Sequence, residues 1–240
     1  MNYIGDLPLN LIGKVAIVTF ASSDQGAAIC RELLNSNANV LGVDSAPAHK
    51  STETSRASHF QFFQYDPKEP LTGKDPLNHA AKMYMKDDVD YFIDVVGTDA
   101  AYTTDLRKEV LAVFKEKGSG LILTVAPVSD FGVDAEQELL RIALSTTREL
   151  LKELKAGGVR WNLIILSGEA SSAKAASVLD SETEAAMKKH MQAHATRRET
   201  SGYAVEPERD VANLVLFFCT KAGGSVEKAL VKGNGSCISF

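Results

Sequence analysis

The sequence predicts one α/β domain built on a doubly wound parallel sheet of about seven strands, with helices on both faces. Short apolar runs rich in β-branched residues recur along the chain, which is typical of strands buried on both faces. Segments with helical periodicity separate most of these runs. With 240 residues, 45% of them hydrophobic, the chain is long enough to bury one core without disulfides or metals.

The first part of the sheet follows from the amino-terminal end of the chain. The first strand, over 14–20, is apolar and rich in β-branched residues, and good helix formers follow over 27–34. The second strand covers 39–44 and the third covers 59–65. A proline-rich break is expected after the third strand, because proline interrupts both helices and strands.

The middle of the chain predicts two more strands and two helices. Strands are expected over 89–96 and 120–125, and the amphipathic segment 106–117 between them predicts a helix that Gly118 ends. A long helix with broad apolar faces is expected over 136–155. Two glycines follow it, as is usual at the end of a helix.

The last part of the chain predicts a strand over 159–166, a helix over 210–219 and a short strand over 229–231. Residues 169–205 are rich in alanine, serine and charges, and they follow the carboxyl end of a strand, where open α/β sheets bind ligands. We expect a mobile helical lid there. No linker or repeat divides the chain, so one Rossmann-like domain is expected over 1–240.

Composition and charge exclude several classes of protein. The chain carries 26 Lys and Arg against 31 Asp and Glu, and its net charge of −5 disfavours an electrostatically driven nucleic-acid binder. No apolar segment approaches the roughly 20 residues that a membrane helix needs. The start lacks the features of a signal peptide, and the three cysteines lie far apart. We therefore expect a cytoplasmic protein with unreactive thiols.

Motifs spread over nearly the whole chain follow a known order. They are an opening strand at 14–19, a turn at 21–23 with Gly26 and Ala28, Asp44 and Asp66 after two strands, and the stretches 158–162 and 206–212. This order resembles the short-chain dehydrogenase/reductase family, whose members have a Rossmann-like fold and transfer hydride with NAD(H) or NADP(H). The resemblance implies the same fold for this chain.

The segment that resembles the family's cofactor turn departs from the pattern T-G-x-x-x-G-x-G. Phe20 and Asp24 stand in place of two of the three glycines, and only Gly26 is kept. Those glycines allow a tight turn and let the backbone approach the pyrophosphate. Phe20 adds bulk, and Asp24 adds an anion where a phosphate would lie, although an acid also stabilises a helix N-terminus. Two like charges about 4 Å apart cost about 4 kcal/mol at an effective dielectric of about 20. We therefore expect no cofactor, with NAD(H) or NADP(H) as the alternative.

If a nucleotide does bind, the resemblance implies which residues would hold it. Ser22 and Ser23 would donate to a phosphate, and Gly26 would allow close approach. Asp44, at the end of the second strand, would accept from a ribose 2′-hydroxyl and favour NAD(H) over NADP(H). Without a nucleotide, Asp44 would be a solvated strand-end residue. Asp66, after the third strand, is the last of the residues that the resemblance implies for nucleotide binding.

The family's catalytic serine, tyrosine and lysine have no counterparts at the matching positions. Pro127 stands at the serine position, and no tyrosine occurs between Tyr102 and Tyr203. Two alignments of the following helix are possible. One puts Glu136 at the tyrosine position and Leu140 at the lysine position, and the other puts Gln137 and Arg141 there. The stretch from Gly97 to Gly120 is also shorter than is usual in the family, which would remove the start of a helix and the family's active-site asparagine. These losses indicate a scaffold that has left dehydrogenase chemistry.

Other side chains near the carboxyl ends of the strands are then the candidate catalytic groups. Acids, hydroxyls, cations and imidazoles can act as acid, base or electrostatic stabiliser. The candidates are Asp94, Ser129, Asp130, Arg141, Glu169, His194 and Tyr203. Each also has a structural explanation, as a hydrogen-bonded carboxylate, a solvated helix residue or a core tyrosine. His190 and His194 lack the glutamate and third ligand of a zinc site, so no metal is expected.

Three functions stay open. The first is a cofactor-independent enzyme that catalyses an isomerisation, cyclisation or elimination on an apolar small molecule, as in secondary-metabolite biosynthesis. The second is a reductase that uses NAD(H) or NADP(H) with atypical catalytic residues, and the third is an inactive binding or scaffold protein. The expected partner is a small-molecule substrate, with no nucleic acid and no membrane, and the resemblance implies a homodimer or homotetramer.

Overall fold

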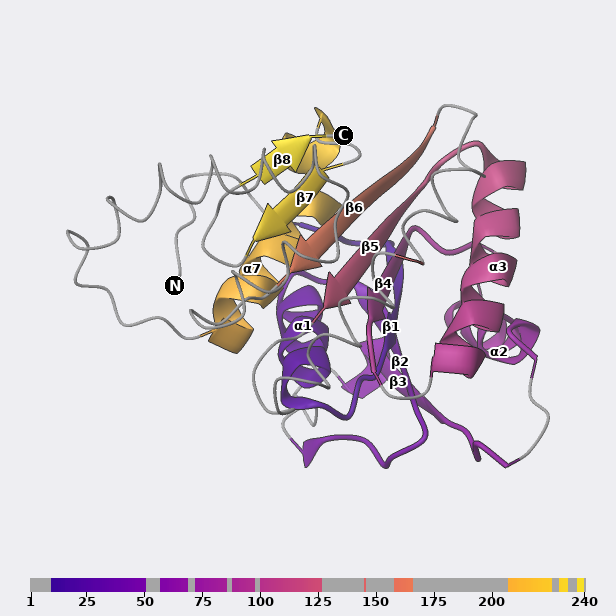
Figure 1. The fold of residues 1–240 in the computed structure, drawn as a ribbon. Helices are drawn as coiled ribbons and strands as arrows, with labels where there is room; N and C mark the ends of the chain where they lie inside the picture. Colours follow the sequence, from indigo (N-terminus) through magenta and orange to yellow (C-terminus); the bar gives the residue numbers. More distant parts are fainter. Residues whose placement is uncertain are drawn as a thin grey trace.

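The described residues form one eight-stranded sheet with helices packed on both faces (Figure 1). The structure, a computed structural model, describes residues 10–50, 57–68, 72–85, 88–97, 100–126, 145, 158–165, 207–225, 229–232 and 237–239. The predicted long helix over 136–155 and the predicted lid over 169–205 lie outside the described residues, apart from the isolated residue 145.

The sheet has the order β3-β2-β1-β4-β5-β6-β7-β8. Its strands are β1 (Val15–Thr19), β2 (Asn39–Asp44), β3 (Phe60–Gln64), β4 (Tyr91–Val95), β5 (Gly120–Ala126), β6 (Val159–Ile165), β7 (Ala229–Lys232) and β8 (Cys237–Ser239). The first seven are parallel, and β8 pairs antiparallel with β7. The prediction of a doubly wound parallel sheet of about seven strands is confirmed, and β8 is an addition too short to be predicted from an apolar run.

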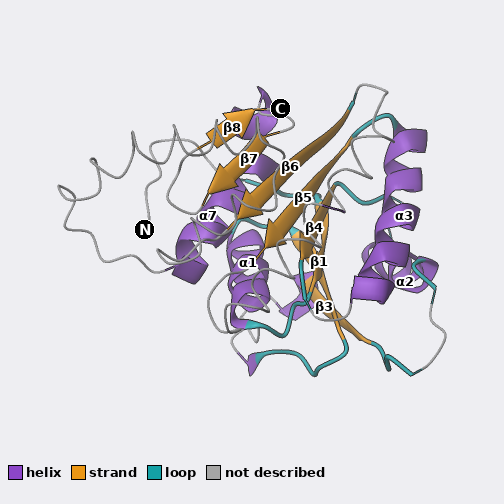
Figure 2. Ribbon diagram, in the orientation of Figure 1, coloured by secondary structure: helices purple, strands orange, loops and turns teal. Residues whose placement is uncertain are grey.

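In the described part of the chain, helices cover both faces of the sheet, as Figure 2 shows. They are α1 (Asp24–Asn35) and α7 (Pro207–Cys219) on one face, and α2 (Lys74–Tyr84) and α3 (Ala100–Lys117) on the other. Short 3₁₀ helices are η2 (Ala57–His59) and η5 (Ala222–Ser225). None of the described helices is both long and apolar enough to span a membrane.

The apolar runs form strands because both of their faces are buried. Val18 and Ile93 belong to the core under α1 and α7, whereas Ile17 and Phe92 belong to the core under α2 and α3. All four side chains are 0% exposed. Burying one such side chain contributes about 1.5–3 kcal/mol, which stabilises continuous apolar strands in the middle of a two-sided sheet.

The helices differ from the predicted ones mainly at their starts. The described helices α1, α3 and α7 begin three to six residues before the predicted ranges, because their first turns carry little hydrophobic pattern. Helix α2 was not predicted at all. Pro76 lies in its first turn, where proline is tolerated, and only Pro76 and Ala80 are fully buried. Its weak apolar pattern explains why the sequence around it indicated only a break.

The chain order of the strands reverses between β1 and β4. From β1, the sheet continues to β2 and β3 on one side and to β4 and the later strands on the other. Ligands of open α/β sheets bind at such a point, outside the carboxyl ends of the strands. Phe20 directly follows β1, and Gly97 lies two residues after β4. We call the region of these two residues the switch point.

Candidate functional site at the carboxyl ends of β1 and β4

The turn between β1 and α1 is closed by its own serine. The hydroxyl of Ser23 donates to the carbonyl of Phe20 at 2.8 Å, and its oxygen accepts from the N–H of Gly26 at 3.0 Å. Ser23 is thus the N-cap of α1, a position that serine favours. Because a hydroxyl has one hydrogen, this bond leaves Ser23 no second donor for a phosphate.

Gly26 is the glycine of the family pattern that this chain keeps, and the structure gives the reason. A Cβ on Gly26 would lie 2.2 Å from the carbonyl oxygen of Phe20. No carbon approaches an oxygen so closely, so a larger residue would push α1 away from the turn. The glycine is required by the packing of the helix against the turn, whether or not a nucleotide binds.

Phe20 has an unusual backbone and an unusual neighbour. Its φ is 51°, in the left-handed region that glycine adopts readily and other residues adopt at a cost of about 1–2 kcal/mol. Its ring lies against Gly97, where an added Cβ would be 2.6 Å from the ring atom Cδ2. The ring also packs against the core under α1 and α7. An aromatic ring therefore fills the switch point between β1 and β4.

The loop that follows β2 is fastened to the same turn. One carboxylate oxygen of Asp44 accepts from the N–H of Ser22 at 2.9 Å, and the other accepts from the N–H of Ala46 at 3.2 Å. The hydroxyl of Ser22 donates to the carbonyls of Ala46 and Pro47, at 3.1 and 2.7 Å. Asp44 is only 3% exposed. The expectation of a solvated Asp44 is wrong, because this loop covers it.

Asp24 lies on the surface of the turn. Its side chain is 78% exposed, and its carboxylate lies 3.3 Å from Nε2 of His49. In a water-like environment, like charges about 4 Å apart repel by about 1 kcal/mol, instead of the 4 kcal/mol expected at lower dielectric. The sequence therefore overstated the repulsion between Asp24 and a phosphate. The bulk of Phe20 is the larger obstacle.

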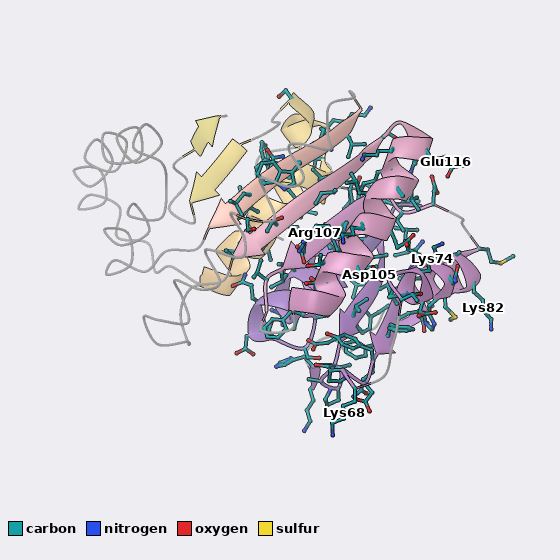
Figure 3. The ribbon with its side chains drawn as sticks, turned by 45° about the vertical axis from the view of Figure 1, so that its right-hand side comes forward. Lys68, Lys74, Lys82, Asp105, Arg107 and Glu116 are labelled. Atoms are coloured by element: carbon teal, nitrogen blue, oxygen red, sulfur yellow. The ribbon has the colours of Figure 1, made fainter. Side chains whose placement is uncertain are left out.

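Asp94 is at the end of β4 and takes part in a buried polar network. One of its oxygens accepts from the hydroxyl of Thr19 at 3.2 Å. The other accepts from Nε and Nη2 of Arg107, at 3.0 and 2.5 Å. The side chains of Asp94 and Arg107 are 0% and 7% exposed. Figure 3 shows Arg107 on the side of α3 that faces the strands, whereas Glu116 points away from them.

This network favours a structural role for Asp94, as the buried carboxylate that joins β1, β4 and α3. Its role as a catalytic acid or base stays a prediction. The sequence did not identify Arg107 as its partner, because the two residues are thirteen positions apart on different elements. No pattern in the sequence distinguishes Arg107 from the neighbouring Lys108 as that partner.

Among the remaining predicted residues, the structure describes Asp66 alone. Asp66 follows β3, is exposed, and accepts from the N–H of Lys68 at 2.9 Å within its own turn. Its role toward a nucleotide stays a prediction. The other candidates lie outside the described residues: Ser129, Asp130, Arg141, Glu169, His194 and Tyr203. Within the described part of the chain, no three His, Cys, Asp or Glu side chains are grouped so that they would hold a metal ion.

The described residues of the turn do not fit a nicotinamide dinucleotide. A pyrophosphate needs a bare turn with free donors, but here the ring of Phe20 occupies the switch point. The hydroxyls of Ser22 and Ser23 donate to backbone carbonyls, and the loop after β2 covers the carboxylate of Asp44. In the part of the chain that the structure describes, groups of the protein itself thus occupy the positions of the pyrophosphate and of the ribose next to Asp44.

Solved structures of other proteins share the fold of this chain. No protein-family model matches the sequence, and no curated protein matches it. A hydroxysteroid dehydrogenase from Escherichia coli is 20% identical, with a TM-score of 0.57, and the match covers 95% of this chain and 99% of that one. A 7α-hydroxysteroid dehydrogenase complexed with NADH and 7-oxo glycochenodeoxycholic acid is 18% identical, with a TM-score of 0.61 and coverages of 95% and 96%.

These matches extend over nearly the whole length of each protein, while the identities are low. They establish a shared architecture and leave the chemistry open, since one fold supports many functions. This chain therefore has the fold of these hydroxysteroid dehydrogenases, which is the fold that its resemblance to the short-chain dehydrogenase/reductase family implied.

Proposed function

We propose that this chain is an enzyme that uses the dehydrogenase fold for a non-redox step on an apolar small molecule, without a nicotinamide cofactor. The reaction class is isomerisation, cyclisation or elimination, as in secondary-metabolite biosynthesis. The contact between Phe20 and Gly97 carries the proposal. It puts an apolar ring at the point where sheets of this topology bind their ligands, so the site favours an apolar molecule over a pyrophosphate.

The sequence supports the same conclusion from the catalytic side. Hydride transfer in the family uses a tyrosine beside a lysine, and this chain has no tyrosine between Tyr102 and Tyr203. A non-redox step needs an oriented substrate and a few acids, bases or cations. The residues proposed for these roles are Asp94, Ser129, Asp130, Arg141, Glu169, His194 and Tyr203.

Substrate and context follow by analogy. Two similar structures are named hydroxysteroid dehydrogenases, and an apolar ring system is a reasonable substrate class for this fold. We further propose that the protein is cytoplasmic and forms a homodimer or homotetramer. A partner among nucleic acids is disfavoured by the net charge of −5.

One observation favours a second function, a reductase with atypical catalytic residues. Asp44 lies at the end of β2, where an acid would meet the ribose of NAD(H), and one similar structure is complexed with NADH. For this function, the loop over Asp44 would have to open and the ring of Phe20 would have to move.

Calorimetric titration with NADH, NAD⁺, NADPH and NADP⁺ separates the two. The proposed function predicts no saturation up to about 1 mM of any of them, equivalent to less than about 4 kcal/mol of binding free energy. Micromolar binding of NADH that the variant Asp44→Ala loses would instead contradict the cofactor-independent enzyme and favour the reductase. Binding that Asp44→Ala retains would place the nucleotide elsewhere, and it would equally count against a cofactor-independent enzyme.

A further inference from the structure

We infer that Phe20, and not Asp24, is the residue that determines whether the switch point accepts a dinucleotide, so that removing its ring opens a latent nucleotide site. This inference rests on the proposed function, because it takes the native protein to bind no nucleotide. It concerns the two positions at which the sequence departs from the glycine pattern of the cofactor turn. The two departures look equivalent in the sequence and differ in the structure.

The first step concerns space. The ring of Phe20 reaches from the end of β1 to Gly97 beyond the end of β4, where a Cβ would be 2.6 Å from Cδ2, 2.9 Å from Cε2 and 2.9 Å from Cγ. Gly97 is buried, so the ring leaves no room between the two strand ends at this place. The strands are direct neighbours, with Val18 opposite Ile93. A ligand that crosses the switch point must displace this ring.

The second step concerns backbone shape. Phe20 has a φ of 51°, which glycine adopts without strain. The turn therefore already has a conformation that suits glycine at position 20. The N-terminus of α1 is held against it by the cap of Ser23 and by the close approach at Gly26. Replacing Phe20 by glycine would remove the ring and keep the turn.

The third step concerns charge. The side chain of Asp24 is 78% exposed and lies 3.3 Å from Nε2 of His49, so water reduces its effect on a nearby phosphate. It also lies in the first turn of α1, where an acid stabilises the helix. Asp24 is consequently a minor obstacle to an anion, whereas the ring of Phe20 is a steric one that salt and solvent do not weaken.

A third obstacle is the loop that Ser22 fastens over Asp44, at the ribose end of the path. The Ser22 hydroxyl holds this loop through the carbonyls of Ala46 and Pro47. This loop is held by polar contacts near the surface, which water can replace, whereas the ring packs against the buried core. We therefore rank Phe20 first, and the experiment includes Ser22 as a competing explanation.

The test compares NADH binding by native protein with binding by Phe20→Gly, Phe20→Ala, Asp24→Asn and Ser22→Ala, each checked for folding by circular dichroism and thermal unfolding. We expect a dissociation constant below about 100 μM for both Phe20 variants, and no saturation for the native protein, for Asp24→Asn or for Ser22→Ala. Phe20→Ala keeps a Cβ and serves as a second variant if one of the pair folds poorly.

Each outcome decides a separate point. If the folded Phe20 variants and the native protein all fail to bind NADH, the inference about Phe20 is overturned and the proposed function stands. A larger gain in Asp24→Asn or Ser22→Ala than in the Phe20 variants also overturns the inference. Micromolar binding by native protein overturns both, because the ring is then no barrier.

Discussion

Arg107 on α3 and Asp94 on β4 form a buried ion pair that joins a helix to the sheet directly beneath the switch point. Two guanidinium nitrogens of Arg107 donate to one carboxylate oxygen of Asp94, and the hydroxyl of Thr19 donates to the other. Thr19 precedes Phe20, and Asp94 lies three residues before Gly97. The pair therefore fixes the two strand ends between which the ring of Phe20 lies.

Removing Arg107 alone should be strongly destabilising. The variant Arg107→Met leaves the Asp94 carboxylate buried without a counter-charge, which costs about 3–5 kcal/mol. The double variant Asp94→Asn/Arg107→Met removes both charges and should recover most of that loss. Urea unfolding of both variants measures the difference. Equal losses in the two variants would show that the charge of Asp94 is not what Arg107 compensates.

The strain at Phe20 predicts an inverted order of stability between two small residues. Both Phe20→Ala and Phe20→Gly lose the packing of the ring, but only alanine keeps the cost of a φ of 51°. Phe20→Gly should therefore be more stable than Phe20→Ala by about 1 kcal/mol, the reverse of the order in a helix. Denaturant midpoints of the two variants measure this, and a more stable alanine variant would refute the strain.

The contact at Gly97 predicts a strong coupling between two positions 77 residues apart. The variant Gly97→Ala forces a Cβ into the ring of Phe20 and should cost about 1–3 kcal/mol, as overpacking does. In the background Phe20→Gly, the same change should cost close to nothing, because the ring is gone. A double-mutant cycle by urea unfolding gives the coupling energy, and additive losses would mean that the ring does not fill this space.

Two buried thiols predict a loss of stability at alkaline pH. Burial raises the pKa of Cys30 and of Cys219 to about 12, so the native protein keeps protons that the unfolded chain releases above about pH 9. The contribution of these thiols to the free energy of unfolding is therefore unchanged below about pH 9, and it falls as the pH rises toward 12. Between about pH 9 and about pH 10, the free energy of unfolding should fall by about 1 kcal/mol for each thiol.

The control for that prediction is the variant Cys30→Ala. Its free energy of unfolding, expressed relative to its own value at pH 8, should fall less between about pH 9 and about pH 10 than that of the native protein. Measurement below about pH 10 limits the contribution of the buried Tyr84 and Tyr91, whose pKa values are also raised by burial. A free energy of unfolding that stays constant to pH 10 would show that the thiols are accessible to solvent.

Much of the architecture is determined by the sequence itself. All seven parallel strands were predicted with ends within two residues. Strands β1, β2, β4 and β5 were found because they are buried apolar runs, whereas the partly buried β3 was found from its aromatic residues. The helices were predicted less well where apolar residues are few, as in α2, which buries only Pro76 and Ala80 fully. The loss of glycine at positions 20 and 24 is also visible in the sequence alone.

Only the tertiary structure decided what those two losses mean. It set the ring of Phe20 against Gly97, exposed Asp24 beside His49, covered Asp44 with a loop, and paired Asp94 with Arg107. The contact of Phe20 with Gly97 joins residues 77 positions apart, because the crossover from β3 to β4 returns the chain to the side of β1. A pattern of residue types records which side chains are present, whereas bulk, exposure and charge pairing depend on which neighbours the folded sheet supplies.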